Sequence, residues 1–162
     1  MSLSTIETAL TRFQPLAMRF QIVSLKNGID LVHDAYNANP LSMEAAFQTV
    51  QSMKKRRRFV AVLGDMKELG DQSPLLHMEL GKKAVQYSTD RLFVVGDKAA
   101  FVRQGAISAG LSEKSISIFD SVADLSTKLV GEIEKGDIIL IKGSRSMKME
   151  QVAWILKEKF GE

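Results

Sequence analysis

Apolar and polar residues follow one another along this chain in blocks. From Ile29 onward, short apolar runs rich in β-branched residues are each followed by a polar turn and an amphipathic stretch. Runs such as "FVAVL" and "IILI" are apolar throughout, which is typical of parallel strands covered on both faces. The repeated strand–helix order predicts an α/β fold with an open, mostly parallel sheet and helices on both faces.

The elements that this pattern predicts have recognisable ends. The expected strands are Arg19–Leu25, Ile29–His33, Phe59–Leu63, Leu92–Val95, Ser115–Phe119 and Ile138–Ile141. The expected helices are Leu41–Met53, Ser73–Ser88, Lys98–Gly110, Ser121–Glu134 and Met147–Phe160. Serine before proline at Ser73-Pro74 favours a helix start, and Gly110 and Gly136 stand where helices should stop.

The first quarter of the chain differs from the rest. Asn27-Gly28 between the first two strands predicts a two-residue hairpin, and therefore one antiparallel strand at the front of the sheet. Thr5–Phe13 predicts a short helix, followed by a proline-containing linker. Because a lone helix cannot bury its own apolar side, we expect it to be the tail of a preceding domain. Met1–Leu3 is interpreted as a cloning remnant.

Composition narrows the class of protein. With 162 residues, 45% of them hydrophobic, the chain is long enough for one packed domain. No apolar run approaches the roughly 20 residues of a membrane span. The absence of cysteine excludes disulfides, and two histidines argue against a zinc site. We therefore predict a cytoplasmic protein without a metal centre, with His77 packed in a helix and His33 as an ordinary strand-end residue.

Much of the net charge of +3 lies in Lys54–Arg58, "KKRRR". Such a run can bind nucleic acid, but no aromatic residues are interleaved for base stacking. The favoured interpretation is structural, with cations closing a helix before a buried strand, and no nucleic-acid partner is expected. Trp154, Met147 and Met149 are predicted to pack the last helix onto the sheet.

Three turns stand where ligands bind open α/β sheets, at the carboxyl ends of strands. In Lys142–Ser146, "KGSRS", a glycine, two hydroxyls and two cations before a helix suit a phosphate or carboxylate, although an ordinary serine cap would use the same residues. Gly64–Gly70, "GDMKELG", lacks the G-x-G-x-x-G spacing of a dinucleotide site, so a tight turn that uses Asp65 and Glu68 is favoured. The chain has no G-x-x-x-x-G-K-[ST] loop and cannot hold ATP phosphates alone.

The third turn, Asp34–Pro40, offers a carboxylate, a phenol and two amides on a loop stiffened by proline. These groups suit recognition of hydroxyls and amides. Asparagine is also common as a cap, so the amides could instead cap the helix that starts near Leu41. Composition leaves both interpretations open.

Taken together, "HDAYNANPLSMEAA", "VAVLGDMKELG", "LLHMELG" and "LIKGSRSMKMEQV" resemble the C-terminal domain of the Mur ligases, over about Thr5 to Leu156. The resemblance implies a Rossmann-like domain at 19–162, preceded at 1–18 by a tag remnant, the end of a central ATPase domain and a hinge linker. It explains both the lone helix and the missing phosphate loop.

The resemblance also implies an activity, an ATP-dependent amide ligation in peptidoglycan synthesis that proceeds through an acyl phosphate. The substrates implied are UDP-N-acetylmuramoyl-tripeptide and D-alanyl-D-alanine, and the compartment is the bacterial cytoplasm. ATP with Mg²⁺ would be held mainly by the absent central domain, over which this domain closes, so the chain alone would be inactive. The alternatives are a stand-alone Rossmann-type nucleotide-binding module and the domain of another Mur-type amide ligase.

Site residues are carried over position by position, with no complete catalytic set in this chain. Those implied to face the nucleotide are Arg19, Asp34, Asn37 and Asn39, and those implied to face substrate are Tyr36, Lys142, Ser144 and Arg145. Ala35 and His33 depart from the serine and second aspartate frequent in the family. We hypothesise that the polar groups of the amide-rich loop stay unsatisfied within the domain, because a partner domain completes them. Asn39→Ala would then lower turnover without lowering the melting temperature.

Overall fold

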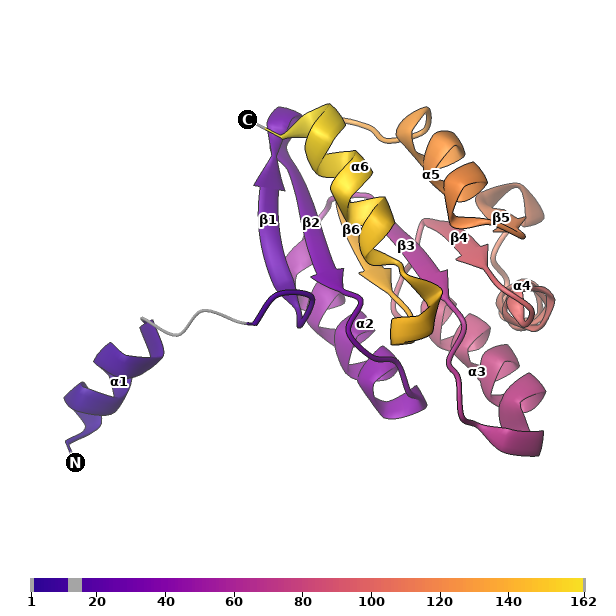
Figure 1. Ribbon diagram of the computed structural model, residues 1–162, viewed down its shortest axis with the longest axis horizontal. Helices are drawn as coiled ribbons and strands as arrows, with labels where there is room; N and C mark the ends of the chain where they lie inside the picture. Colours follow the sequence, from indigo (N-terminus) through magenta and orange to yellow (C-terminus); the bar gives the residue numbers. More distant parts are fainter. Residues whose placement is uncertain (1, 12–15, 162) are drawn as a thin grey trace.

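The computed structural model describes residues 2–11 and 16–161, which form one twisted sheet with helices on both faces and a first helix lying apart from it (Figure 1). The strands are β1 (Gln21–Leu25), β2 (Ile29–Asp34), β3 (Phe59–Gly64), β4 (Arg91–Val95), β5 (Ile116–Phe119) and β6 (Ile138–Lys142). Their order is β1-β2-β6-β3-β4-β5, and every neighbouring pair is parallel except β1 and β2. The predicted fold class is confirmed.

Helices cover both faces of this sheet. The helices are α1 (Leu3–Thr11), α2 (Pro40–Lys54), α3 (Ser73–Gln86), α4 (Ala99–Ser108), α5 (Val122–Val130) and α6 (Glu150–Phe160), and all but α1 lie in two layers around the sheet. Helices α2, α3 and α4 share one apolar core with the sheet, and α5 and α6 share the other. Along β3, Phe59 and Ala61 face the first core while Val60 and Val62 face the second. This two-sided burial is why the strand is apolar at every position.

The first hairpin has the predicted turn residues but a longer loop. Asn27 and Gly28 both take left-handed conformations, with φ of 61° and 69°, as a primed turn requires. The ladder pairs Leu25 with Ile29, so the three residues 26–28 separate the strands. The predicted two-residue loop is therefore wrong, because Lys26 also belongs to the loop. The antiparallel strand itself is confirmed.

Two helix ends differ from the sequence pattern. Helix α5 ends at Val130 with Gly131 as its C-cap, before the predicted Glu134, and beyond this end Glu132 pairs with Arg91, whose Nε lies 2.7 Å from its Oε2. Helix α6 begins after the predicted Met147, because Lys148 takes a left-handed conformation with φ of 52°. Both departures come from contacts or backbone angles that hydrophobic periodicity does not register.

The last helix is packed onto the sheet by residues other than its tryptophan. Met149 is fully buried and Met147 packs against the same core, as predicted. Trp154 is 60% exposed, so its predicted packing role is wrong. The inward positions of α6 are Val152, Ala153 and Leu156.

Helix α1 begins at Leu3, slightly before the predicted Thr5. Its predicted end at Phe13 and the start of the predicted linker fall outside the described residues. Within the part of the chain that is described, none of the helices combines the length and hydrophobicity needed to cross a membrane.

The basic run between α2 and β3 is used inside the domain, at the edge of the sheet where the parallel strands begin. Arg57 donates from Nη1 to Asp30 Oδ2 at 2.5 Å and from Nη2 to the Asp137 carbonyl at 2.8 Å. Lys54 pairs with Asp90 at 3.0 Å, near the end of α2. These contacts support the structural interpretation of the run.

Candidate functional site

The three turns singled out from the sequence meet at the edge of the sheet where the parallel strands end. Strand β6 lies between β2 and β3, and the chain leaves it toward the layer of α5 and α6. From β2 and β3 the chain instead leaves toward the layer of α2 and α3. Open α/β sheets bind ligands at such a reversal, outside the carboxyl ends of the strands, and we call this edge of the sheet the crevice.

Lys142 and Asp34 form a buried ion pair beneath this crevice. They are register partners on β6 and β2, and Lys142 Nζ lies 2.6 Å from Asp34 Oδ2. Lys142 also donates to the Asn37 carbonyl at 3.0 Å and is 2% exposed. Asp34 Oδ1 accepts a hydrogen bond from the Phe20 amide at 3.0 Å. Lys142 is therefore placed to hold the loop and the incoming chain, not to present its ammonium to a substrate as the sequence implied.

Asn39 is a helix cap, which corrects the hypothesis that its amide is left unsatisfied. Its side-chain Oδ1 accepts from the Ser42 backbone amide at 2.9 Å, while Ser42 Oγ accepts from the Asn39 backbone amide at 3.0 Å. This reciprocal capping box satisfies two donors that the helix itself cannot. Asn37 is exposed, and its Oδ1 accepts from the Ala38 amide at 2.8 Å. The capping interpretation of this loop holds for Asn39.

Arg19 and Tyr36 form an exposed stack at the same edge. The guanidinium carbon of Arg19 lies 4.1 Å from the centroid of the Tyr36 ring, which is an attractive cation–π arrangement. Tyr36 is 44% exposed, and its amide donates to the Met18 carbonyl at 3.1 Å. Met18 and Phe20 both have positive φ, of 63° and 50°. The segment that leads into the domain is thus fixed to the amide-rich loop in an uncommon backbone conformation.

Ser144 is engaged within the domain. Its Oγ accepts from the Lys67 amide at 2.8 Å, and its own amide donates to the Asp65 carbonyl at 3.0 Å. A β-carbon at Gly143 would lie 3.1 Å from the Gly64 α-carbon, so this glycine permits two loops to touch. Ser144 and Gly143 therefore join the ends of β6 and β3, and the Ser144 amide and hydroxyl oxygen are already hydrogen-bonded within the domain instead of being free for the predicted anion site.

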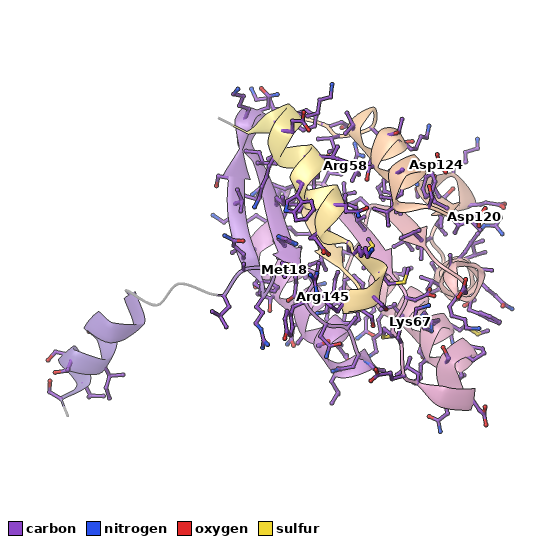
Figure 2. The ribbon with its side chains drawn as sticks, in the orientation of Figure 1. Met18, Arg58, Lys67, Asp120, Asp124 and Arg145 are labelled. Carbon is purple, nitrogen blue, oxygen red and sulfur yellow. The ribbon has the colours of Figure 1, made fainter. Side chains whose placement is uncertain are left out.

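Arg145 is the residue of the "KGSRS" turn that faces out of the domain. Its side chain is 55% exposed, and its Nη1 lies 2.6 Å from Glu150 Oε1 and 3.5 Å from Met18 Sδ. In Figure 2, Arg145 and Met18 lie side by side, and Lys67 lies along the same side of the molecule. Arg145 begins a 3₁₀ turn that precedes α6, so the guanidinium, not the N-terminus of α6, carries the positive charge offered to an anion.

Asp65 links its own loop to the "KGSRS" turn and to the loop that follows β4, a role that sequence reasoning only partly anticipated as a tight turn. It is 1% exposed, with Oδ2 3.0 Å from Lys67 Nζ and Oδ1 accepting from the Lys98 amide at 3.2 Å. Its carbonyl also accepts from the "KGSRS" turn. The ion pair with Asp65 raises the pKa of Lys67. The signal that could have found it is a lone carboxylate directly after an all-apolar strand.

His77 supports the same loop from beneath and is packed in its helix, as predicted. It is fully buried, its Nδ1 donates to the Ser73 carbonyl at 2.7 Å, and its Nε2 accepts from the Met66 amide at 3.0 Å. Burial lowers its pKa, although the Ser73 carbonyl opposes the shift. Because Nε2 must accept, the bonded ring is the neutral form. His33 is also buried, and burial lowers its pKa.

The part of the chain that the structure describes contains no cluster of side chains that could bind a metal ion. Across residues 2–11 and 16–161, no three histidine or acidic side chains come close enough together to hold a metal ion. The exposed groups at the crevice include two guanidinium groups, from Arg19 and Arg145, the Tyr36 phenol and the Asn37 side chain. Such an arrangement suits anions that arrive from outside the domain.

Comparison with known sequences identifies similar proteins. Residues 18–145 match the family described as Mur ligase, glutamate ligase domain. The chain is 35% identical over 143 residues to a UDP-N-acetylmuramoyl-tripeptide–D-alanyl-D-alanine ligase of Bacillus subtilis, covering 88% of this chain and 31% of that protein. It is 33% identical over 171 residues to the ligase of that name from Mycobacterium leprae, covering 96% of this chain and 33% of that protein.

Comparison with solved structures also identifies similar proteins. A MurF structure from Acinetobacter baumannii matches with a TM-score of 0.84 and 30% identity, over 98% of this chain and 34% of that one. A MurF ligase from Thermotoga maritima in complex with ADP matches with a TM-score of 0.72 and 28% identity, over 97% of this chain and 36% of that one. The chain thus spans about a third of the length of the proteins it resembles.

Proposed function

Because the chain belongs to the Mur ligase family through its glutamate ligase domain, we propose that it is the C-terminal domain of a UDP-N-acetylmuramoyl-tripeptide–D-alanyl-D-alanine ligase. The observation that carries this proposal is the outward-facing Arg145 at the crevice, in a chain that matches one third of such ligases. Residues 1–18 would then be a tag remnant, the end of the central ATPase domain and the hinge. Residues 19–162 would be the closing domain.

The reaction proposed has two steps. A carboxylate oxygen of the tripeptide attacks the γ-phosphorus of ATP, and ADP leaves, which gives an acyl phosphate. The amine of D-alanyl-D-alanine then attacks the acyl carbon; phosphate leaves with the C–O bond pair, and the nitrogen loses a proton as the amide forms. Closure of this domain over the ATPase domain would exclude water, which otherwise hydrolyses the acyl phosphate.

Each exposed group of the crevice has a part in this proposal. Arg145 would bind the carboxylate of the incoming dipeptide, because a guanidinium matches a carboxylate with two parallel hydrogen bonds. Arg19, stacked on Tyr36 at the hinge, would approach the nucleotide phosphates when the domain closes. The exposed Asn37 would face the same cleft. Lys142 and Ser144 would hold the loops that carry these groups.

ATP and its Mg²⁺ would be held mainly by the central domain. The chain has no phosphate-binding loop, and within its described residues no metal-binding cluster is formed. The relatives named above are bacterial proteins, and we place the ligase in the bacterial cytoplasm, acting in peptidoglycan synthesis with no nucleic-acid partner. The bound Mg²⁺ would neutralise phosphate charge, while this chain would supply only cations and closure.

The test compares the chain alone with the chain joined to its native upstream region. The joined protein is expected to release phosphate with ATP and UDP-N-acetylmuramoyl-tripeptide only when D-alanyl-D-alanine is added. The isolated chain is expected to release none and to bind ATP weakly by titration calorimetry. Micromolar binding of ATP or NAD by the isolated chain would instead favour a stand-alone nucleotide-binding module.

A further inference from the structure

Helix α6 begins with a buried carboxylate whose partners are few. Glu150 is 6% exposed, and its Oε1 lies 2.6 Å from Arg145 Nη1. Its Oε2 is buried and, across residues 2–11 and 16–161, has no hydrogen-bond partner. Burying a carboxylate with one oxygen unpaired costs free energy. Position in the first turn of a helix offsets part of that cost, since the helix N-terminus favours negative charge.

Glu150 engages only one of the three guanidinium nitrogens of Arg145. Nη1 contacts Glu150 and Met18, whereas Nε and Nη2 have no partner among the described residues. The free Nε–Nη2 edge can donate two parallel hydrogen bonds, the geometry that matches a carboxylate. The ion pair thus leaves the carboxylate-binding edge of Arg145 open, on a side chain that is 55% exposed.

An arginine without such a contact would sample many rotamers at this exposed position. Fixing a long side chain on binding costs conformational entropy. In this structure the guanidinium is already ordered before any ligand binds, because it forms a short ion pair with the buried Glu150 on α6. Glu150 itself is buried, and it is the first residue of α6.

We propose that Glu150 is a positioning residue that orients Arg145, so that the free Nε–Nη2 edge receives the carboxylate of the incoming dipeptide. This inference rests on the proposed function. Glu150 would then contribute to the affinity for the dipeptide without contacting it. A residue that only stabilised α6 would change melting temperature and not dipeptide affinity.

The test uses the ligase formed by joining this chain to its native upstream region. The variants are Glu150→Gln, Arg145→Ala, both together, Arg145→Lys, and the control Glu158→Gln, which changes an exposed carboxylate on the same helix. The Michaelis constant is measured for D-alanyl-D-alanine and for its C-terminal amide, which lacks the carboxylate. ATP and the UDP-linked substrate are kept saturating, and the melting temperature of each variant is recorded.

We expect Glu150→Gln to raise KM for the dipeptide about tenfold with kcat within about twofold, and to reduce the preference for the acid over the amide. Arg145→Lys keeps the charge but loses the two-nitrogen edge, so it should raise KM similarly without loss of stability. In the Arg145→Ala background, Glu150→Gln should have no further effect on KM. Glu158→Gln should match the unmodified ligase.

Two results would overturn the inference while leaving the proposed function standing. One is an active ligase in which Arg145→Ala raises KM for the dipeptide and Glu150→Gln does not. The other is an equal rise in KM for the acid and the amide in Glu150→Gln, because that would show a general disturbance of the site. If the unmodified ligase does not join the dipeptide at all, the proposed function fails, and this inference fails with it.

Discussion

Replacing Gly81 by alanine should separate two helices that touch through their backbones. A β-carbon at Gly81 on α3 would lie 2.7 Å from the amide nitrogen of Ala106 on α4, and closer still to the Val102 carbonyl oxygen. Ordinary contact begins near 3.4 Å, so the helices must move apart by at least about 0.7 Å, the difference between these distances. Gly105 on α4 approaches the Met78 backbone on α3 in the same way.

The energetic consequence is the balance of two effects. Alanine favours a helix over glycine by about 1 kcal/mol, which would stabilise the variant. Overpacking typically costs about 1–3 kcal/mol, and here the clash is with backbone atoms that no rotamer change can relieve. Taking the upper end of that cost for a backbone clash, we expect a net loss of about 2 kcal/mol, equivalent to a fall in melting temperature of about 4–8 °C for a domain of this size.

The assay is urea unfolding of the isolated chain, followed by circular dichroism, with Gly131→Ala as the matched control. Gly131 has φ of −76°, and a β-carbon there would meet only the Lys128 carbonyl at an ordinary 3.6 Å. The control should stay within about 0.5 kcal/mol of the unmodified chain. Gly105→Ala added to Gly81→Ala should cost less than the sum of the two single changes, since both open the same interface.

A Gly81→Ala variant as stable as the Gly131→Ala control would refute this reasoning. It would mean that α3 and α4 do not approach as closely as described, or that the interface yields at little cost. A loss of stability with full additivity of Gly81→Ala and Gly105→Ala would refute the shared interface alone.

Three further changes test other contacts. Asn39→Ala should cost about 1 kcal/mol by removing the capping box, seen as a lower urea midpoint of the isolated chain; an unchanged midpoint would contradict the cap. Hydrogen bonds from Arg91 hold the pKa of Glu132 at about 2, below the 4.5 expected for an unperturbed glutamate, so this pair's stabilisation should be complete above pH 4.5 and disappear as pH falls toward 2. Urea midpoints of Glu132→Gln and the unmodified chain should therefore converge over that range. Lys142→Met should cost about 2–3 kcal/mol by leaving Asp34 unpaired, and adding Asp34→Asn should recover part of the loss in thermal unfolding.

The fold follows from the sequence to an unusual degree because the inner strands β3 and β6 are buried on both faces and almost wholly apolar. That pattern has one common physical solution, a parallel sheet between two helical layers. Helix ends were less predictable: Lys148 takes a left-handed conformation before α6, and α5 ends at Val130, beyond which Glu132 pairs with Arg91. Trp154 shows the same limit, since hydrophobicity alone could not tell which face of α6 turns inward.

That the candidate turns meet was predictable from the sequence, whereas the contacts of their side chains were not. The turns at the carboxyl ends of the strands were identified from sequence, and they do lie together. Which of their polar side chains are free could not be foreseen, because donors and acceptors from distant segments decide it. Lys142 meets Asp34 across 108 positions of sequence, and Lys67 meets Ser144 across 77.

The amino-acid sequence by itself determined the class of fold, the order of its elements and the family resemblance, because these depend on local periodicity and on short motifs that each lie within one segment. Only the tertiary structure decided that Asn39 caps a helix, that Lys142 and Ser144 have their polar partners within the domain, and that Glu150 contacts Arg145 through one nitrogen. The physical reason is that a polar side chain takes its role from the partner it finds, and those partners are set by folding.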